Sequence, residues 1–180
     1  MKTLKTFAAA TATAVLLATG AIAANPEVGG APMFENKNIV ENAVNSADHT
    51  TLVAAVKAAG LVDTLASEGP FTVFAPVNSA FDALPAGTVD TLLKPENKDM
   101  LTKVLTAHVV AGNWSAADIA AKARASSDGF YHFNAVSGDA LSAQVKGKNV
   151  YIIDESGNAS RVTIADVNQS NGVIHVVNSV

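Results

Sequence analysis

The sequence contains no cysteine. Disulfide frameworks, thiolate zinc sites, cysteine nucleophiles and a lipid-modified cysteine are therefore all excluded. Charge is also scarce, because Lys, Arg, Asp and Glu make up 16% of the 180 residues and the formal net charge is −4. A nucleic-acid-binding protein normally has a basic surplus, so no nucleic-acid partner is expected. With 49% hydrophobic residues the chain is too apolar for a disordered protein, and its length is typical of one domain.

Motifs of the common enzyme classes are missing as well. The chain has no G-x-S-x-G nucleophile elbow, no G-x-x-x-x-G-K-[ST] phosphate loop and no G-x-G-x-x-G dinucleotide turn. Its four histidines, at 49, 108, 132 and 175, share no metal-ligand spacing. His108 and His175 lie in apolar stretches, where a histidine is usually a hydrogen-bonded interior group. The sequence therefore predicts a non-catalytic protein without metal or cofactor, and a hydrolase using either histidine with a nearby acid is a minor alternative.

One uncharged stretch stands at the N-terminus. Two lysines precede the run from Phe7 to Ala18, and the small residues of Ala21-Ile22-Ala23 follow it. This order is typical of a signal peptide. A membrane-spanning helix needs about 20 apolar residues, more than this run provides. We predict that residues 1–23 are a signal peptide cleaved after Ala23 or Ala24, that the mature chain has no transmembrane segment, and that it is exported to the periplasm or outside the cell.

The rest of the sequence changes character near its middle. Residues 24–37 have two prolines, two glycines and no apolar period, and they predict a flexible lead-in. From Ile39 to about Gly129 most apolar residues recur at helical spacing, including a helix with Asp48 as its cap and Gly60 at its end. Short branched and aromatic runs separated by turn residues follow. Helices and strands that are segregated in this way indicate an α+β fold.

Two short stretches stand out from this pattern. In the first, residues 69–81, alternating apolar residues form a strand that Pro76 ends, and Asn78 or Ser79 is expected to cap the helix that follows. In the second, residues 171–177, apolar side chains alternate to both sides, which suits a strand buried on both faces.

These two stretches resemble the two signature boxes of fasciclin-type (beta-Ig-H3/fasciclin) domains. Residues 84–89 and 94–98 also look like the family, and Ala107-His108-Val109-Val110 stands where the family has a Tyr-His pair before two valines. The resemblance predicts a single domain over residues 38–180. It implies a wedge or sandwich of two β-sheets with a helical N-terminal half packed against it, adhesion-type binding outside the cell or in its envelope, and no known cofactor.

The resemblance also assigns candidate residues. It implies a partner-binding role for His108, Val109 and Val110. The box residues are expected to be mainly structural, and they are Thr72, Phe74, Pro76, Asn78, Phe81, Gly172, Ile174 and His175. Ala107 stands in place of the family tyrosine, which leaves open any receptor binding through that phenol.

The leading hypothesis from the sequence is an exported, non-catalytic interaction module. Its partner would be a protein or polysaccharide of the cell surface, envelope or extracellular matrix, bound by a monomer or a weak homo-oligomer. The alternative is a periplasmic carrier that binds a small apolar ligand between helices and sheet, because the Ala- and Val-rich helical half could leave room for a pocket.

Overall fold

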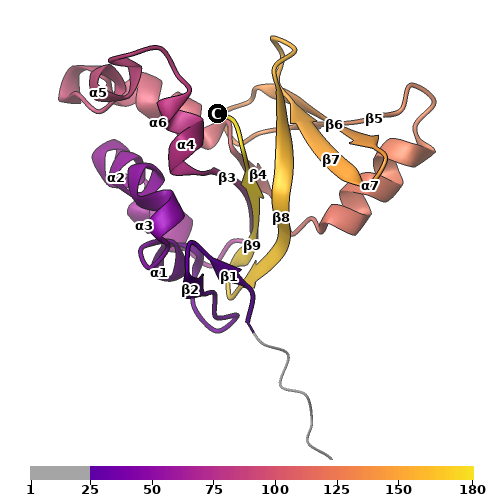
Figure 1. Ribbon diagram of the computed structural model, residues 1–180, viewed down its shortest axis with the longest axis horizontal. Coiled ribbons are helices and arrows are strands. Elements are labelled where there is room, and N and C mark those ends of the chain that lie inside the picture. Colours follow the sequence, from indigo (N-terminus) through magenta and orange to yellow (C-terminus); the bar gives the residue numbers. More distant parts are fainter. Residues whose placement is uncertain (1–24) are drawn as a thin grey trace, which may run out of the picture.

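A computed structural model describes residues 25–180, and the predicted signal peptide at 1–23 lies outside them. Most helices come in the first half of the chain and most strands in the second, so the predicted α+β class is confirmed (Figure 1). The elements are β1 (Glu27–Val28), β2 (Ala31–Pro32), α1 (Ile39–Ala43), η1 (Ala47–His49), α2 (Thr50–Ala59), α3 (Val62–Ala66), β3 (Phe71–Pro76), α4 (Asn78–Asp82), α5 (Thr88–Leu92), η2 (Pro95–Asn97), α6 (Lys98–Thr106), β4 (Val109–Ala111), α7 (Ala116–Ala125), β5 (Phe130–Asn134), β6 (Ala140–Lys146), β7 (Asn149–Ile153), β8 (Ala159–Gln169) and β9 (Gly172–Val177). Among these helices, none is long and apolar enough to cross a membrane.

Seven strands form one mixed sheet in the order β4-β3-β9-β8-β7-β6-β5. Only β3 and β9 pair in parallel among the strands of this sheet. Strand β8 pairs first with β7 and then with β9, and its register against β9 shifts at two points. Such irregularities bend a strand, and the two sides of the sheet diverge from β8 as a wedge (Figure 1). The predicted wedge is thus confirmed, with β8 shared by both of its sides.

The open edges of this sheet come close to each other. The backbone N–H of Val136, two residues beyond β5, donates a 2.7 Å hydrogen bond to the carbonyl oxygen of Val109 in β4. The wedge is therefore nearly closed into a barrel.

Two apolar cores lie on opposite faces of the central strands. Val73 in β3 with Ile174 and Val176 in β9 belong to the core beneath helices α1 to α6. Phe74 and Val177 face the other core, inside the wedge, where residues of β6, β7 and α7 meet them. All six residues of β9 are buried, as the alternating sequence predicted. Since both faces of β3 and β9 are covered, these two strands are the centre of the molecule.

The predicted flexible lead-in differs from the structure. Residues 27–32 form the small β1–β2 hairpin, and the side chains of Val28 and Met33 are only 3% and 2% exposed in the first core. Backbone hydrogen bonds join this segment to the domain, from Ala47 to Gly29 and from Ser170 to Lys37. Prolines and glycines interrupt any apolar periodicity in this segment. Burial of Val28 and Met33 is nevertheless enough to attach it to the first core.

The C-terminal end of α2 matches the prediction from the sequence, and its N-terminal end does not. Gly60 is the left-handed C-cap with φ 72°, as predicted. Asp48, the predicted N-cap, instead lies within η1, and α2 begins at Thr50 without a side-chain cap from its own N-cap residue.

Candidate functional site

The side chains of the first box hold β3 to its neighbours. Thr72 is fully buried; its hydroxyl donates to the carbonyl oxygen of Gly112 (2.7 Å) and accepts from the N–H of Trp114 (2.9 Å). Phe74 is 2% exposed and stacks on the ring of His175 at 5.7 Å. Pro76 ends the strand as predicted, and it is buried, as is Phe81. Thr72 and Phe74 therefore anchor the strand on its wedge face.

Asn78 has a different role from the predicted one. The N-cap residue of α4 is Val77, and it makes no side-chain cap bond. The Asn78 carboxamide oxygen instead accepts from the N–H of Thr51 (3.1 Å) and its amide donates to the carbonyl oxygen of Ala47 (2.8 Å). Asn78 thus caps α2, a helix that precedes it by about 30 residues, because the turn after β3 brings it against that helix.

The second box contains a linking residue that the sequence analysis did not single out. The buried Asn171 amide donates to the carbonyl oxygens of Leu65 and Ser67, both at 2.7 Å, and its oxygen accepts from the N–H of Ile39 (3.0 Å). Gly172 follows it, where a Cβ would collide with the carbonyl oxygen of Phe71. Gly172 thus allows β9 to lie close to β3, and the Asn171 side chain links the turn before β9 to α1 and to the end of α3. These partners of Asn171 are too distant in sequence for any local pattern to predict.

His175 is a buried structural group. Its Nε2 donates to the carbonyl oxygen of Trp114 (2.7 Å), and its Nδ1 accepts from the N–H of Asp166 (3.1 Å). These two bonds fix the neutral tautomer with the proton on Nε2. Burial lowers the pKa of His175, against smaller opposing effects of the Trp114 carbonyl and the Asp166 carboxylate.

His49 and His132 also have hydrogen-bond partners. His49 is 3% exposed, and its ring nitrogens lie 2.9 Å from the Ser46 hydroxyl and 3.4 Å from the Ala75 carbonyl oxygen; burial lowers its pKa. His132 lies at the surface and contacts Asp128 and Ser142. Within residues 25–180 no group of three or more His, Asp and Glu side chains could hold a metal ion.

Of the three predicted partner-binding residues, only His108 is accessible. Val109 and Val110 are each 6% exposed and point into the first and the second core, respectively. His108 is half-buried at the end of α6, where its Nδ1 lies 2.7 Å from the carbonyl oxygen of Val104. Burial lowers the pKa of His108, with smaller opposing effects of Val104 and of the Asp154 carboxylate. Direct contact with a partner is thus open to His108 and not to the two valines.

His108 lies beside an open groove of about 400 Å³. The end of α6 forms one wall, and the β6–β7 side of the wedge forms the other. The floor contains buried apolar side chains, among them Leu141, Ile152 and Val177. A groove of this volume falls within the range of small-ligand sites.

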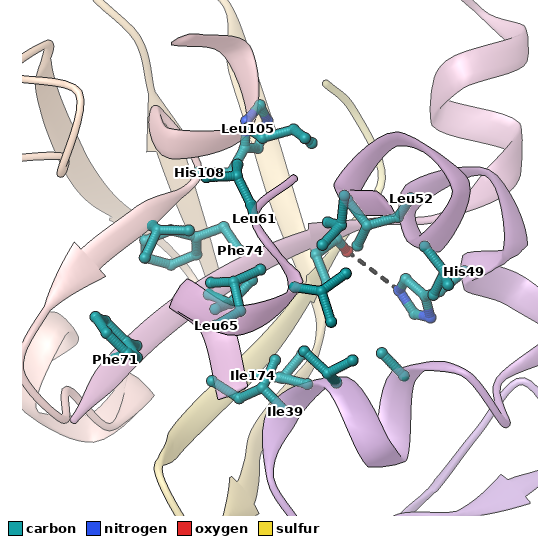
Figure 2. A pocket seen from close by; sticks show the side chains of 18 of the residues that line it. Ile39, His49, Leu52, Leu61, Leu65, Phe71, Phe74, Leu105, His108 and Ile174 are labelled. Atoms are coloured by element: carbon teal, nitrogen blue, oxygen red, sulfur yellow. Dashed lines mark hydrogen bonds between the residues drawn. The ribbon is translucent and has the colours of Figure 1, made fainter. Parts of the chain in front are cut away.

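A second, narrower cavity of about 70 Å³ lies between the helices and the sheet. Figure 2 shows apolar side chains of α1, α2 and α3 pointing into it from one side, and Phe71 and Ile174 from the sheet. Phe74 and His108 line both this cavity and the groove, so their side chains stand between the two spaces.

Comparison with known proteins shows which family and which sequences this chain is similar to. A family model described as Fasciclin domain matches residues 47–180. The chain is 51% identical over 142 residues to Protein sll1483 of Synechocystis sp., covering 79% of this chain and 71% of that protein. It is 35% identical over 143 residues to Immunogenic protein MPB70 of Mycobacterium bovis, covering 77% of this chain and 65% of that protein.

The fold itself is similar to a solved structure. A FAS1 domain pair from the insect cell adhesion molecule Fasciclin I matches with a TM-score of 0.68 over 79% of this chain and 50% of that chain. The two sequences are 16% identical, so this likeness concerns the fold alone.

Proposed function

The chain belongs to the fasciclin domain family, and we propose that it is an exported, non-catalytic adhesion module that binds a protein or polysaccharide of the cell surface or envelope. The observation that carries the proposal is the groove of about 400 Å³ beside His108, which joins a predicted partner-binding residue to a space that a partner can enter. The buried His49 and His175 are engaged with backbone or hydroxyl groups, which favours structural rather than catalytic roles.

The rest of the proposal concerns location and organisation. The N-terminal pattern over residues 1–23 supports export to the periplasm or the extracellular space. We further propose that residues 38–180 function as one domain, extended by the β1–β2 hairpin, and that the protein acts as a monomer or weak homo-oligomer.

Binding to intact cells tests the proposal. Protein comprising residues 25–180 would be labelled with a fluorophore and titrated onto cells and isolated envelopes of the organism that encodes it. Saturable binding is expected, and the same labelled protein after heat unfolding is the control. Prior treatment of the cells with protease or with glycosidases separates a protein partner from a polysaccharide. Binding that never saturates, or that the unfolded control reproduces, contradicts the proposal.

The apolar cavity beneath the helices favours a second candidate function, a carrier for a small apolar ligand. Its place between helices and sheet is the one expected for such a pocket, although about 70 Å³ admits only a very small molecule unless Phe74 or His108 moves. Native mass spectrometry of protein recovered gently from its own envelope fraction tests this function. A stoichiometric small-molecule adduct would support it, and a bare chain would count against it.

A further inference from the structure

The groove beside His108 has an apolar floor and is lined by charged residues as well. Phe74, Leu141, Ile152 and Val177 lie along the floor, all at most 6% exposed as whole residues. Ala107 lines the groove next to His108, and its side chain is a single methyl group. An unbranched aliphatic chain can lie on such a floor while its end reaches water.

The rim of the groove has more negative than positive charge. Asp139, Asp154 and Glu155 line it, and Lys103 is the lysine among its lining residues. Lys103 Nζ lies 3.4 Å from a carboxylate oxygen of Asp139, so one of the three acids is already neutralised. The Asp154 carboxylate accepts hydrogen bonds from the backbone N–H groups of Ser156 and Asn158, which hold it in place. Within residues 25–180 neither Asp154 nor Glu155 forms an ion pair, and two such carboxylates at one groove favour a cationic occupant.

His108 adds a hydrogen-bond acceptor at the inner end. Its Nδ1 lies 2.7 Å from the carbonyl oxygen of Val104, which can only accept, so Nδ1 carries the proton and Nε2 has a free lone pair. In the part of the chain that the structure describes, no buried side-chain nitrogen or oxygen lacks a partner. Since Nε2 has no hydrogen-bond partner among these residues, it is not fully buried, and the groove is one of the two spaces that His108 lines.

From these three features we propose that the groove binds a lysine side chain of a partner protein. The lysine stem lies on the apolar floor, and its ammonium donates to Nε2 of His108 and faces the carboxylates of Asp154 and Glu155. This inference rests on the proposed function and specifies it, because it names the chemistry by which the module recognises a protein partner.

Two small probes test the chemistry of the groove without any partner. Hexylammonium and hexanoate have the same six-carbon body and opposite charge. Each would be titrated into ¹⁵N-labelled protein (residues 25–180) while amide shifts of residues 103–108 and 152–156 are followed by NMR. Hexylammonium is expected to shift these amides saturably, and hexanoate is not. Equal responses to the two probes, or none to hexylammonium, would overturn the proposal.

Three variants locate the binding. Glu155→Gln should weaken hexylammonium binding about two- to fivefold, the effect of one exposed ion pair. Glu96→Gln, a matched change in η2 away from the groove, should leave it unchanged. Ala107→Phe places a large ring in the wall of the groove next to His108 and should abolish binding, and its unchanged thermal unfolding would confirm that it folds. Loss of affinity in Glu96→Gln equal to that in Glu155→Gln would contradict a site in the groove.

Cell binding then connects the groove to the partner. Ala107→Phe is expected to lose saturable binding to cells, and excess hexylammonium should compete with the unaltered protein. If the unaltered protein binds cells and Ala107→Phe binds equally well, the lysine proposal fails and the proposed function stands. If the unaltered protein does not bind cells at all, the proposed function fails, whatever the probes show.

Discussion

At the scale of single residues, the polar side chains of the two boxes act as links between distant elements. Asn78 joins the turn after β3 to the start of α2, and Asn171 joins the turn before β9 to α1 and to the end of α3. Each makes more than one hydrogen bond to backbone groups at or near the end of a helix, where backbone groups commonly need partners outside the helix. The sequence predicted that Asn78 or Ser79 caps α4, whereas Asn78 caps α2, because only local partners are visible in a sequence.

The role of Asn78 can be tested against its neighbour. We expect Asn78→Ala to lower the free energy of unfolding by about 1–2 kcal/mol, because the start of α2 loses its cap and the carbonyl of Ala47 loses a donor. Ser79→Ala should change it by less than about 0.5 kcal/mol, since Ser79 is exposed on α4. Urea unfolding of both variants measures the difference. A larger loss for Ser79→Ala would mean that the cap belongs to α4 after all.

Phe74 is the residue for which pattern and structure agree most fully. The alternation in β3 predicted that its ring is buried, and the ring lies in the wedge core, 5.7 Å from His175 and 6.2 Å from Phe133. Phe74→Ala should therefore destabilise the protein by about 3–5 kcal/mol, measured by denaturant unfolding. Phe34→Ala is the control, because Phe34 is 36% exposed. A cost for Phe74→Ala within about 0.5 kcal/mol would be incompatible with a core position.

At the scale of elements, apolar periodicity predicted helices and strands that have a regular apolar pattern. It did not predict the β1–β2 hairpin, which has none. The helix that ends at Gly60 and the strand β9 follow regular patterns, and the structure confirms both. The β1–β2 hairpin has no pattern to read, since each of its strands has only two residues. Its attachment depends on long-range burial of Val28 and Met33, which composition cannot reveal.

A pair of methionines tests whether the hairpin belongs to the folded unit. Met33 is 2% exposed, whereas Met100 in α6 is 60% exposed. Met33→Ala should lower the free energy of unfolding by about 2–5 kcal/mol through lost burial and a cavity. Met100→Ala should leave it within about 0.5 kcal/mol, because alanine is also a good helix former. Equal stability of the two variants in urea unfolding would show that residues 25–37 do not contribute to the core.

At the scale of the whole molecule, the fold class and the wedge were predictable, but the groove was not. The segregation of helices and strands predicted the fold class, and the two boxes carried the resemblance that implied the wedge. The groove arises where the end of α6, the β6–β7 side and the end of β9 meet, which are segments that no sequence pattern places together. The assignment of His108 to partner binding stays a prediction, and no sequence pattern indicated the acidic residues that line the groove with it.

Three histidines whose pKa is lowered make the stability of the whole molecule dependent on pH. His49, His108 and His175 each have a pKa lowered by burial from the ordinary value of 6.5. The unfolded chain therefore takes up protons at a higher pH than the folded chain does, so the free energy of unfolding falls as pH decreases below 6.5. The free energy of unfolding stops falling for this reason only when the pH is below the lowered pKa values of the folded chain. Protonated His175 would in addition place a second donor against the N–H of Asp166.

Urea unfolding between about pH 7.5 and about pH 5 measures this dependence above the range in which carboxylates titrate. The pKa of Asp139, lowered mainly by its hydrogen bond from Ser137, affects stability only below its ordinary value of 3.8. We expect a steady loss of stability across the window. His49→Gln should make the loss shallower because one buried imidazole is gone, whereas His132→Gln at the surface should not. A flat profile for the unaltered protein, or a slope that His132→Gln reduces as much as His49→Gln does, would show that the buried histidines are not its source.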